Sequence, residues 1–446
     1  MKSEIHRASL TASTRAILWL YEFIWFLVLP IALLRLYWKG RIQKAYREHI
    51  SERLGVYKKI LTGNIVWVHA VSVGETRASA PLVKALLQED YQVLLTHMTP
   101  TGRATGADIF SGEIASGQLQ QVYLPYDISW LVAAFFRTFS PKLGLVMETE
   151  VWPNLVVGAG HANLPILLVN ARLSERSARR VAQFGSAGSD IYGAFTQILA
   201  QTLLDAKRYQ SLGLNNITVT GNLKFDVEIN ASQVDKALEL RKLLPSHIRL
   251  LCAASTRDGE EKIVIQSWLN LLEKSPELAP NIRLLIVPRH PQRFDEVYQE
   301  LQSKQLNVIR KSQLNNQQLA DALNSAAIIL GDSMGEMAFY YALSDVVVMG
   351  GSLQPLGGQN FIEACGLGRP IILGEHTFNF QQASHDAVEQ EAAIRISHLG
   401  ELTQAMSILL KDDQLREKMS ANAIDFADQH MGATGKIVKI VKEYLQ

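Results

Sequence analysis

GGSLQPLGGQNFIEACGLGRPIILG, residues 350–374, is the stretch that decides the fold. It follows an apolar run at 346–349 and ends in a second one at 370–373, and both runs have the composition of buried parallel strands. Between them lie a glycine-rich turn and a predicted helix that opens near Asn360. This order of strand, turn, helix and strand predicts a βαβ unit of a parallel sheet.

The glycine-rich turn has the composition of an anion-binding loop. Glycine tolerates positive φ and lets backbone N–H groups approach a ligand closely, and the next helix start adds free N–H groups and the positive end of its dipole. Glu363, about one turn into that helix, is placed to bind ribose hydroxyls. Two interpretations fit these residues taken alone: a seat for a nucleotide-activated group, or a tight turn with a solvent-facing carboxylate. The glycines concerned are Gly350, Gly351, Gly357 and Gly358.

The same alternation of short apolar strands and helices runs through most of the chain. In the first half, strands are predicted at 65–71, 92–96, 122–124, 142–147, 166–170, 198–200 and 217–220. In the second half, they are predicted at 249–253, 283–287, 307–310, 327–330, 346–349, 370–373 and 393–396, and helices at 399–411, 413–430 and 435–445 close the chain. Such alternation predicts right-handed βαβ units and parallel sheets of the α/β class.

The predicted organisation is two doubly wound, Rossmann-like domains facing a cleft. The first domain covers 61–226, a polar and helix-prone linker covers 227–247, and the second domain covers 248–446. The last helix is free to pack back on the first domain. Residues 1–60 form a separate N-terminal segment with an anchor and a basic stretch.

Composition narrows the class of protein. The 446 residues are 48% hydrophobic and 20% charged, as in a globular protein, and the net charge of +1 gives no reason to expect nucleic acid. Cys252 and Cys365 lie far apart within predicted βα units. This spacing argues against a disulfide framework or a zinc site and fits a reducing compartment.

The N-terminal segment differs from the rest because it is strongly apolar. Residues 16–34 carry one charge, Glu22, and are about long enough to cross a membrane as a helix. Aromatic residues stand near both ends, no signal-peptidase site follows, and the basic residues beyond it predict a cytoplasmic face on that side. Glu22 and Pro30 leave open a helix embedded in one leaflet, and a buried helix of a soluble domain is the third interpretation. The basic residues are Arg35, Lys39, Arg41, Lys44, Arg47, Arg53, Lys58 and Lys59.

In doubly wound sheets, ligands bind at the carboxyl ends of strands. In the first half, these positions carry Ser72, Gly74, Glu75, Arg103, Glu148, Glu150 and Arg172. Carboxylates at two strand ends suit general-base catalysis, since one can take a proton while another raises its pKa. Glu75 in a first helical turn is equally suited to capping, and of Glu148 and Glu150 only one faces the cleft if the strand continues through them.

In the second half, the corresponding positions favour phosphate. Arg289 can hold a phosphate bidentately, and Ser333 with nearby N–H groups can supply an anion seat at a helix start. Simple capping by Ser255 and Ser333 is the alternative. The full set is Ser255, Arg289, His290, Ser333, Met334, Gly335, Glu336, Gly357, Gly358, Asn360 and Glu363.

Nine strings spread in order over nearly the whole chain resemble the 3-deoxy-D-manno-octulosonic acid (Kdo) transferases of lipopolysaccharide synthesis. They are SVGE (72–75), TPTGR (99–103), YLPYD (123–127), ETEVWPN (148–154), NARLS (170–174), GNLKFD (221–226), PRHPQR (288–293), GDSMGE (331–336) and GGQNFIEA (357–364). The resemblance implies a GT-B glycosyltransferase with CMP-Kdo as donor and a lipid A precursor, lipid IVA, as acceptor. It also implies an inverting reaction at the cytoplasmic face of the inner membrane, without metal or other cofactor.

Residue by residue, the resemblance makes Glu75 the general base that deprotonates the 6′-hydroxyl of the acceptor. It places Arg103 and Glu148 or Glu150 in the acceptor or sugar pocket, and it directs Lys224 to the donor phosphate or the Kdo carboxylate. Donor contacts come from the second-half set given above. No DxD-type motif is evident.

Three other functions compete with this one. The nearest is a GT-B enzyme that uses another nucleotide sugar. A dinucleotide oxidoreductase would need G-x-G-x-x-G after the first strand, which residues 72–75 lack. A membrane-tethered binding module without catalysis is the third, and no string reports how many Kdo units are added.

Overall fold

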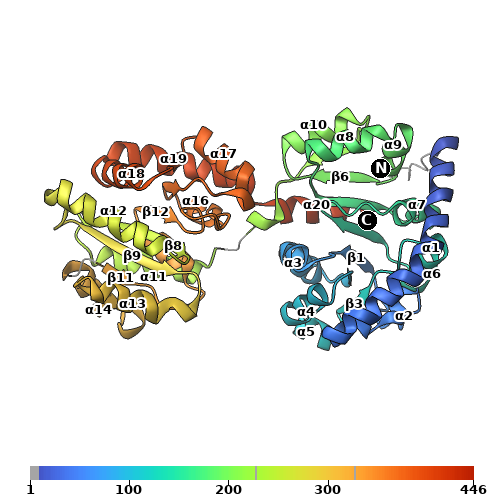
Figure 1. The fold of residues 1–446 in the computed structure, drawn as a ribbon, viewed down its shortest axis with the longest axis horizontal. Helices are drawn as coiled ribbons and strands as arrows, with labels where there is room; N and C mark the ends of the chain where they lie inside the picture. Colours follow the sequence, from blue (N-terminus) through green and yellow to red (C-terminus); the bar gives the residue numbers. More distant parts are fainter. Residues whose placement is uncertain (1–9, 227–228, 326–327, 446) are drawn as a thin grey trace. The chain divides into compact units, whose positions relative to one another are not determined.

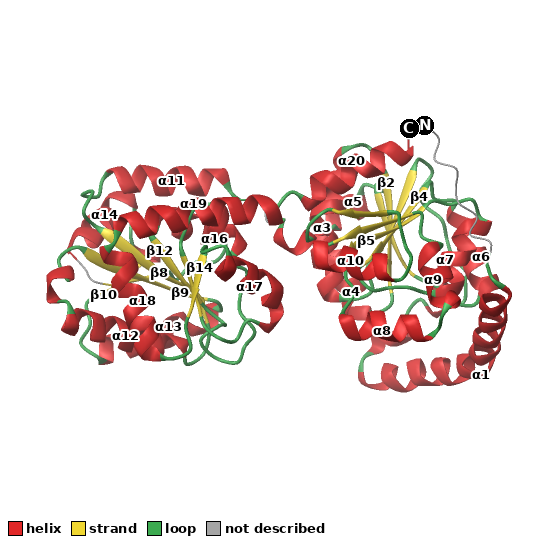
Figure 2. Cartoon of the chain, turned by 90° about the horizontal axis from the view of Figure 1, so that it is seen from above, coloured by secondary structure: helices red, strands yellow, loops and turns green. Residues whose placement is uncertain are grey.

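A computed structural model gives the fold and describes residues 10–226, 229–325 and 328–445. The chain divides into two compact units. The first contains Met1–Asp226 and Met431–Gln446, and the second contains Val227–His430. In each unit, helices cover both faces of a parallel sheet (Figures 1 and 2).

The first unit holds a seven-stranded sheet in the order β3-β2-β1-β4-β5-β6-β7. Its strands are β1 Ile65–His69, β2 Gln92–His97, β3 Leu119–Tyr123, β4 Leu143–Met147, β5 Ile166–Ala171, β6 Gln197–Ala200 and β7 Ile217–Val219. The strand order reverses between β1 and β4, where Val66 pairs with Leu143. Ligands of such sheets bind beyond the carboxyl ends of the strands at this switch point.

Alternating side chains of these strands enter two separate cores. Trp67 packs with the helices of one face, whereas Val66 and Val68 pack on the other. The helices of the first unit are α1 Ala12–Ile42, η1 Lys44–Arg47, α2 Ile50–Arg53, α3 Val73–Gln88, α4 Pro100–Ile109, α5 Ser111–Ala115, α6 Ser129–Phe139, α7 Pro153–His161, α8 Glu175–Gln183, α9 Ser186–Gly193, α10 Leu203–Ser211, η2 Leu223–Phe225 and α20 Ala433–Leu445.

The second unit repeats the plan in the order β10-β11-β9-β8-β12-β13-β14, with its switch point between β8 and β12. Its strands are β8 Arg249–Thr256, β9 Ile282–Pro288, β10 Val308–Arg310, β11 Ile328–Leu330, β12 Val346–Met349, β13 Ile371–Leu373 and β14 Ala393–Arg395. Its helices are α11 Ala231–Lys242, α12 Glu260–Lys274, η3 Pro276–Leu278, η4 Pro291–Arg293, α13 Phe294–Ser303, η5 Lys311–Gln313, α14 Asn316–Ser325, α15 Met337–Leu343, α16 Ile362–Gly366, η6 Phe378–Phe380, α17 Gln381–Glu389, α18 Leu399–Lys411 and α19 Asp413–His430.

The chain returns to the first unit at its end. The carboxylate of Asp226 accepts hydrogen bonds from the backbone N–H groups of Gly432 and Ala433, which precede and begin α20. Ile437 and Val441 of α20 are buried in the same core as Val66. A carboxylate at the start of a helix satisfies free N–H groups there.

The structure contains a strand at each of the fourteen predicted positions. The predicted strand at 327–330 begins at Ile328, and residue 327 lies outside the described residues. The predicted linker differs: within 227–247, of which 227 and 228 are not described, α11 belongs to the second unit and packs on α15. Its buried side chains are Ala237 and Leu240, too few to give the stretch an apolar pattern.

The predicted apolar stretch at 16–34 lies within α1, which contains Pro30 and has the length and the apolar composition of a membrane-crossing helix. The predicted helix near Asn360 begins later, at Ile362, because the Asn360 side-chain oxygen accepts the backbone N–H of Ile362.

Candidate active site

Three carboxylates gather at the switch point of the first sheet. Glu75 stands in the first turn of α3, directly after β1, and Glu148 and Glu150 follow β4, the neighbouring strand. Burial raises the pKa of Glu75, and the charge of Glu148 raises it further. Burial and the charges of Glu75 and Glu148 raise the pKa of Glu150 to about 7. The carboxylates therefore act on one another electrostatically, as groups of one site do.

Glu75 is held by a capping box. The Ser72 backbone N–H donates to Glu75 Oε2 at 2.8 Å, and the Glu75 backbone N–H donates to Ser72 Oγ at 3.4 Å. This geometry fixes the carboxylate against the helix start. The capping interpretation is therefore correct, and it leaves the role as a base to be tested separately.

Glu148 and Glu150 do not alternate across the sheet, because β4 ends at Met147. Glu148 has a φ of 55°, in the left-handed region, and its Oε1 lies 2.8 Å from Nζ of Lys224. The Trp152 indole N–H donates to Glu150 Oε2 at 2.8 Å. The sharp turn after β4 thus brings both carboxylates to Glu75, and Lys224 joins them from η2, which packs on α3.

We expect Glu150→Gln to stabilise the first unit near pH 8 and to change little near pH 5. The folded-state pKa of about 7 lies above the ordinary value of 4.5, so between these values the folded chain retains a proton that the unfolded chain has released. Stability is then lost as the pH rises through this window, and a neutral Gln removes that loss. The measurement is the difference in melting temperature between variant and wild type at the two pH values.

The exposed Glu175 provides the control. Glu175→Gln should change the melting temperature little relative to wild type at both pH values. A difference for Glu150→Gln that does not grow with pH would show that Glu150 keeps its ordinary pKa.

Of the two arginines predicted for the acceptor side, Arg103 has another carboxylate as its ion-pair partner. Nη1 of Arg103 pairs with Oε2 of Glu52 at 2.5 Å, and its guanidinium lies 5.0 Å from the centre of the Tyr123 ring. Arg172 follows β5 and is exposed. Glu52 was missed at the level of sequence, because it lies in the four-residue helix α2, 71 residues before Tyr123 at the end of β3, whose backbone N–H it accepts at 2.7 Å. Gly74 has open space: an added Cβ would meet only Ser72 Oγ, at 3.8 Å.

In the second unit, the glycine-rich turn lies at the switch point between β8 and β12. A Cβ on Gly350 would stand 2.3 Å from the carbonyl oxygen of Ser255, so the close approach of the two strand ends requires glycine there. Ser255 is buried, and its φ is 53° at the irregularity in the pairing of β8 with β9. The Gly358 N–H donates to the Gly351 carbonyl at 2.7 Å and closes the turn. Gly357, with a φ of 92°, completes the positive-φ positions of this turn.

The buried carboxylate of Glu260 holds this turn in place by accepting hydrogen bonds from its backbone. Its Oε2 accepts the backbone N–H groups of Gly351 at 2.6 Å and Arg257 at 2.8 Å, and its Oε1 accepts that of Leu353 at 2.9 Å. Glu260 begins α12, so the sequence presents it as an ordinary first-turn acid. Two of its three hydrogen-bond partners lie more than ninety residues away in sequence, so no local sequence pattern reveals these bonds.

Arg289 and Glu363 stand at the same carboxyl edge of the sheet, Arg289 directly after β9 and Glu363 in the first turn of α16. Both charges act on the buried Tyr341, whose pKa is raised chiefly by burial, further by Glu363, and lowered by Arg289. Burial also raises the pKa of Glu363. Arg289 and His290 follow β9 and are exposed, so they are accessible to a ligand. These groups fit the predicted phosphate and ribose contacts.

The polar side chains of the segment 333–336 bond to each other and to Lys311. Nζ of Lys311 lies 2.7 Å from both carboxylate oxygens of Glu336, and Ser333 Oγ donates to the same carboxylate. Burial alone would raise the pKa of Glu336, but the hydrogen bonds from Lys311 and Ser333 outweigh it and lower the pKa. The predicted anion seat at a helix start is wrong for Ser333, because α15 begins at Met337 with Glu336 as its cap. Met334 is exposed and Gly335 has a φ of 76°.

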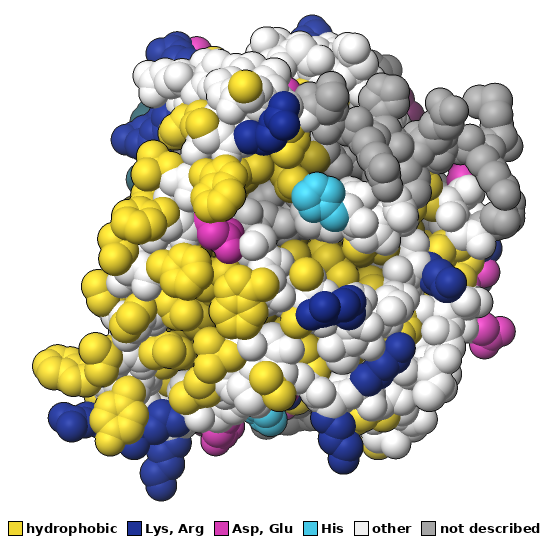
Figure 3. Space-filling view, turned by 90° about the vertical axis from the view of Figure 1, so that its right-hand side faces the viewer, with side chains coloured by type: hydrophobic (Ala, Val, Ile, Leu, Met, Phe, Trp, Pro, Cys, Tyr) yellow, Lys and Arg dark blue, Asp and Glu magenta, His cyan; other side chains and the backbone are white. Residues whose placement is uncertain are grey.

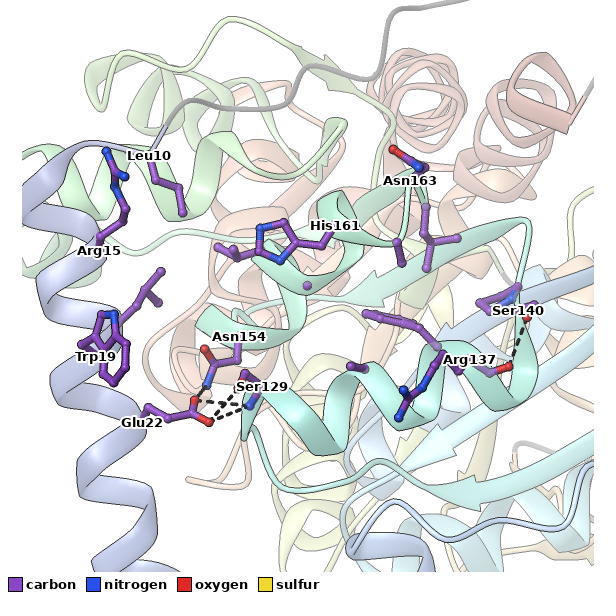
Figure 4. Close-up of a pocket in the computed structure, with 18 of the residues that line it drawn as sticks. Leu10, Arg15, Trp19, Glu22, Ser129, Arg137, Ser140, Asn154, His161 and Asn163 are labelled. Carbon is purple, nitrogen blue, oxygen red and sulfur yellow. Dashed lines mark hydrogen bonds between the residues drawn. The ribbon is translucent and has the colours of Figure 1, made fainter.

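A cavity of about 940 Å³ lies elsewhere in the first unit, between α1 and the pair α6 and α7 (Figure 4). Its wall contains Trp19, Glu22, Ser129, Arg137 and His161. None of the predicted site residues lines it. Among the described residues, no group of His, Cys, Asp and Glu side chains is arranged to hold a metal ion.

Comparison with known proteins agrees with the motifs. A family model described as 3-deoxy-D-manno-octulosonic-acid transferase (kdotransferase) matches residues 48–227. A 3-deoxy-D-manno-octulosonic acid transferase of Bordetella pertussis is 41% identical over 380 residues, 85% of this chain and 87% of that protein. The protein of that name from Haemophilus influenzae is 34% identical over 416 residues, 90% and 92% of the two chains.

The chain is similar in structure to a solved glycosyltransferase from Rickettsia africae. The superposition covers 86% of this chain and 98% of that protein, with a TM-score of 0.52 and 12% identity. At this identity the likeness concerns the fold alone. With the two seven-stranded parallel sheets, it confirms the predicted GT-B class of two Rossmann-like domains.

Proposed function

The chain belongs to the Kdo transferase family and is a glycosyltransferase of lipopolysaccharide biosynthesis, and we propose that it transfers Kdo from CMP-Kdo to lipid IVA with Glu75 as general base. The reaction we propose is an inverting displacement that needs no metal ion. The observation that carries this proposal is the position of Glu75, in a cluster of three carboxylates with its pKa raised by burial and by Glu148. A base whose pKa moves towards the working pH transfers protons most effectively.

In the proposed step, the Glu75 carboxylate takes the proton of the acceptor hydroxyl. The hydroxyl oxygen then forms a bond to the anomeric carbon of Kdo, while the bond from that carbon to the phosphate oxygen of CMP breaks. CMP leaves with the electron pair, and attack opposite to it inverts the anomeric configuration.

The second unit supplies the groups that suit the leaving CMP. Arg289 and Glu363 at the carboxyl edge of the sheet match a phosphate and a ribose. Preformed cations and N–H donors stabilise negative charge in a transition state without a metal. In the first unit, Lys224 pairs with Glu148, whose charge acts on the proposed base, and we propose that Lys224 binds the donor phosphate or the Kdo carboxylate.

Membrane attachment through α1 completes the proposal. This helix is apolar over most of its length, and basic residues follow on its carboxyl-terminal side. We propose that it holds the enzyme at the cytoplasmic face of the inner membrane, where a lipid acceptor is within reach.

The experiment that tests this function incubates purified protein with CMP-Kdo and lipid IVA, in the presence of EDTA, and identifies the product by mass spectrometry. We expect a mass increase of one or more Kdo units. Competition by CMP, but not by UDP or GDP, should accompany it. Transfer from a different nucleotide sugar would favour the alternative GT-B enzyme, and loss of transfer with EDTA would contradict metal independence.

Arg289→Ala is expected to raise KM for CMP-Kdo by roughly 10–100-fold and to leave KM for lipid IVA unchanged. A charge-assisted hydrogen bond contributes about 1.5–3 kcal/mol, which corresponds to that range. Arg289→Lys is the matched variant, because it keeps the charge but loses the bidentate geometry. Its KM for CMP-Kdo should lie between those of the wild type and Arg289→Ala. Steady-state kinetics with each substrate varied in turn measures both constants. Unchanged donor kinetics in the Ala variant would reject the phosphate contact.

A further inference from the structure

α1 has two faces along its whole length. Residues that are not exposed recur at intervals of three or four, which is the spacing of one helical stripe. The stripe therefore lies against the first unit from the first turn of α1 to its last. Its members are Thr14, Ile17, Leu18, Tyr21, Glu22, Trp25, Leu29, Ala32, Leu33, Leu36 and Gly40.

The apolar part of this stripe packs on the segment that leads into α6. The ring of Trp25 lies 5.4 Å from that of Tyr126, and Leu29, Leu33 and Leu36 pack in one cluster with Ile128 and Leu131. The carboxyl-terminal end is fixed by Arg47, whose guanidinium donates to the Tyr37 carbonyl at 3.0 Å and lies 4.1 Å from the Tyr37 ring centre.

The single acid in the apolar stretch is one of the docking contacts. Glu22 accepts hydrogen bonds from the Ser129 N–H at 3.1 Å, from Ser129 Oγ at 2.8 Å and from Asn154 Nδ2 at 2.8 Å (Figure 4). Ser129 and Asn154 stand in the first turns of α6 and α7, where a carboxylate is favourable. At the start of α1, Asp190 of α9 accepts the Thr11 N–H at 3.0 Å. Polar bonds thus join α1 to the unit at two places, one of them in the middle of its apolar run.

The opposite face of α1 is apolar and exposed. Its side chains are exposed by 61% at Leu27, 64% at Ile31, 64% at Leu34 and 72% at Trp38. Figure 3 shows hydrophobic side chains gathered in a band on this face of the molecule, with Lys and Arg side chains at one end. Such a surface fits the acyl region of a leaflet with anionic headgroups beside it.

We propose that α1 does not cross the bilayer but lies in the plane of one leaflet, docked on the first unit by its inner stripe and inserted into lipid by its outer face. A crossing helix needs about 20 residues surrounded by lipid. Crossing would either draw Ser129, Asn154 and Asp190 into the hydrocarbon or break their bonds and leave Glu22 without them, and both are unfavourable. This inference rests on the membrane attachment proposed above.

The docking has a consequence for the acceptor. The segments from β3 to α6 and from β4 to α7 leave the carboxyl edge of the first sheet, the edge that carries Glu148 and Glu150. Glu22 binds the first turns of these two helices. The leaflet that holds α1 therefore lies beside the edge of the sheet at which an acceptor headgroup would react.

Cysteine labelling in membranes tests the topology. The native Cys252 and Cys365 are both buried, so one introduced cysteine would be the reactive thiol of the folded chain. The two variants are Ala12→Cys and Ile42→Cys, at exposed positions near the two ends of α1. A membrane-impermeant maleimide should label both in inverted vesicles and neither in intact spheroplasts. Labelling of Ala12→Cys from the periplasmic side, with Ile42→Cys labelled from the cytoplasmic side, would overturn the proposal.

Cross-linking tests the docked state directly. Glu22→Cys with Ser129→Cys should form a disulfide on mild oxidation in membranes, whereas Phe23→Cys with Ser129→Cys should not, because Phe23 lies on the outer face. No cross-link in the first pair, or equal cross-linking in both, would contradict docking. Sedimentation with membranes separates the two hypotheses, since a soluble wild-type chain would reject the attachment itself and not merely its topology.

Discussion

Glu75→Gln is expected to reduce kcat for Kdo transfer by roughly 10²–10⁴-fold, the usual contribution of a general base, without lowering the melting temperature. The Gln side chain keeps an oxygen that can accept the Ser72 N–H, so the capping box survives. Its amide cannot take a proton at neutral pH. The substitution therefore separates the capping role of Glu75, which the structure shows, from its proposed role as general base.

Two further measurements sharpen this result. Glu75→Ala removes both roles, so it should lose activity and also about 1 kcal/mol of stability from the helix start. In the wild type, kcat/KM should fall as the pH drops through the pKa of Glu75, which lies above the ordinary 4.5. If Glu75→Gln turns over at nearly the wild-type rate, Glu75 is only a capping residue and the base must be sought among Glu148 and Glu150.

The strands could be predicted from sequence because each is an apolar run bounded by turn residues. Strands buried on both faces, such as β4 and β12, cannot be mistaken for surface segments. The ends of strands differ from the predicted ends. β1 stops at His69, short of the predicted 71, because Val71 already belongs to the turn that leads to the Ser72 cap. The sequence predicts a linker in place of α11, because only two of its side chains, Ala237 and Leu240, are buried and the stretch therefore has no apolar pattern.

The candidate site was predictable only where the residues stand directly after strands. Glu75, Glu148 and Glu150 could be found because parallel strands bring their carboxyl ends to one edge. The sequence did not reveal that Glu52 pairs with Arg103, because the two residues lie 51 positions apart. It did not reveal the docking contacts of Glu22 either, because their partners lie more than 100 residues away. Long-range pairing of this kind depends on how helices cover the sheet, which periodicity does not specify.

Glu260→Ala is expected to destabilise the second unit by about 3 kcal/mol or more and to raise KM for CMP-Kdo by at least about tenfold. The Glu260 side chain is fully buried and accepts three backbone N–H groups, two of them from the glycine-rich turn. Without the carboxylate these donors are left unsatisfied in the interior, at a cost of about 1–3 kcal/mol each. The turn would then lose its geometry, so binding of the proposed donor should weaken while acceptor binding does not.

Asp258→Ala is the matched control, because Asp258 lies in the same loop but is 91% exposed and makes one surface ion pair with Arg293. Such pairs contribute about 0–1 kcal/mol, so its melting temperature and donor KM should stay close to wild type. Glu260→Gln should be intermediate, since its amide keeps one acceptor oxygen but turns a donor towards N–H groups. Thermal unfolding and donor-varied kinetics of the three variants measure this order. A Glu260→Ala protein with wild-type stability and donor KM would show that the strands and α16 alone position the turn, and that the buried carboxylate is not what shapes the donor site.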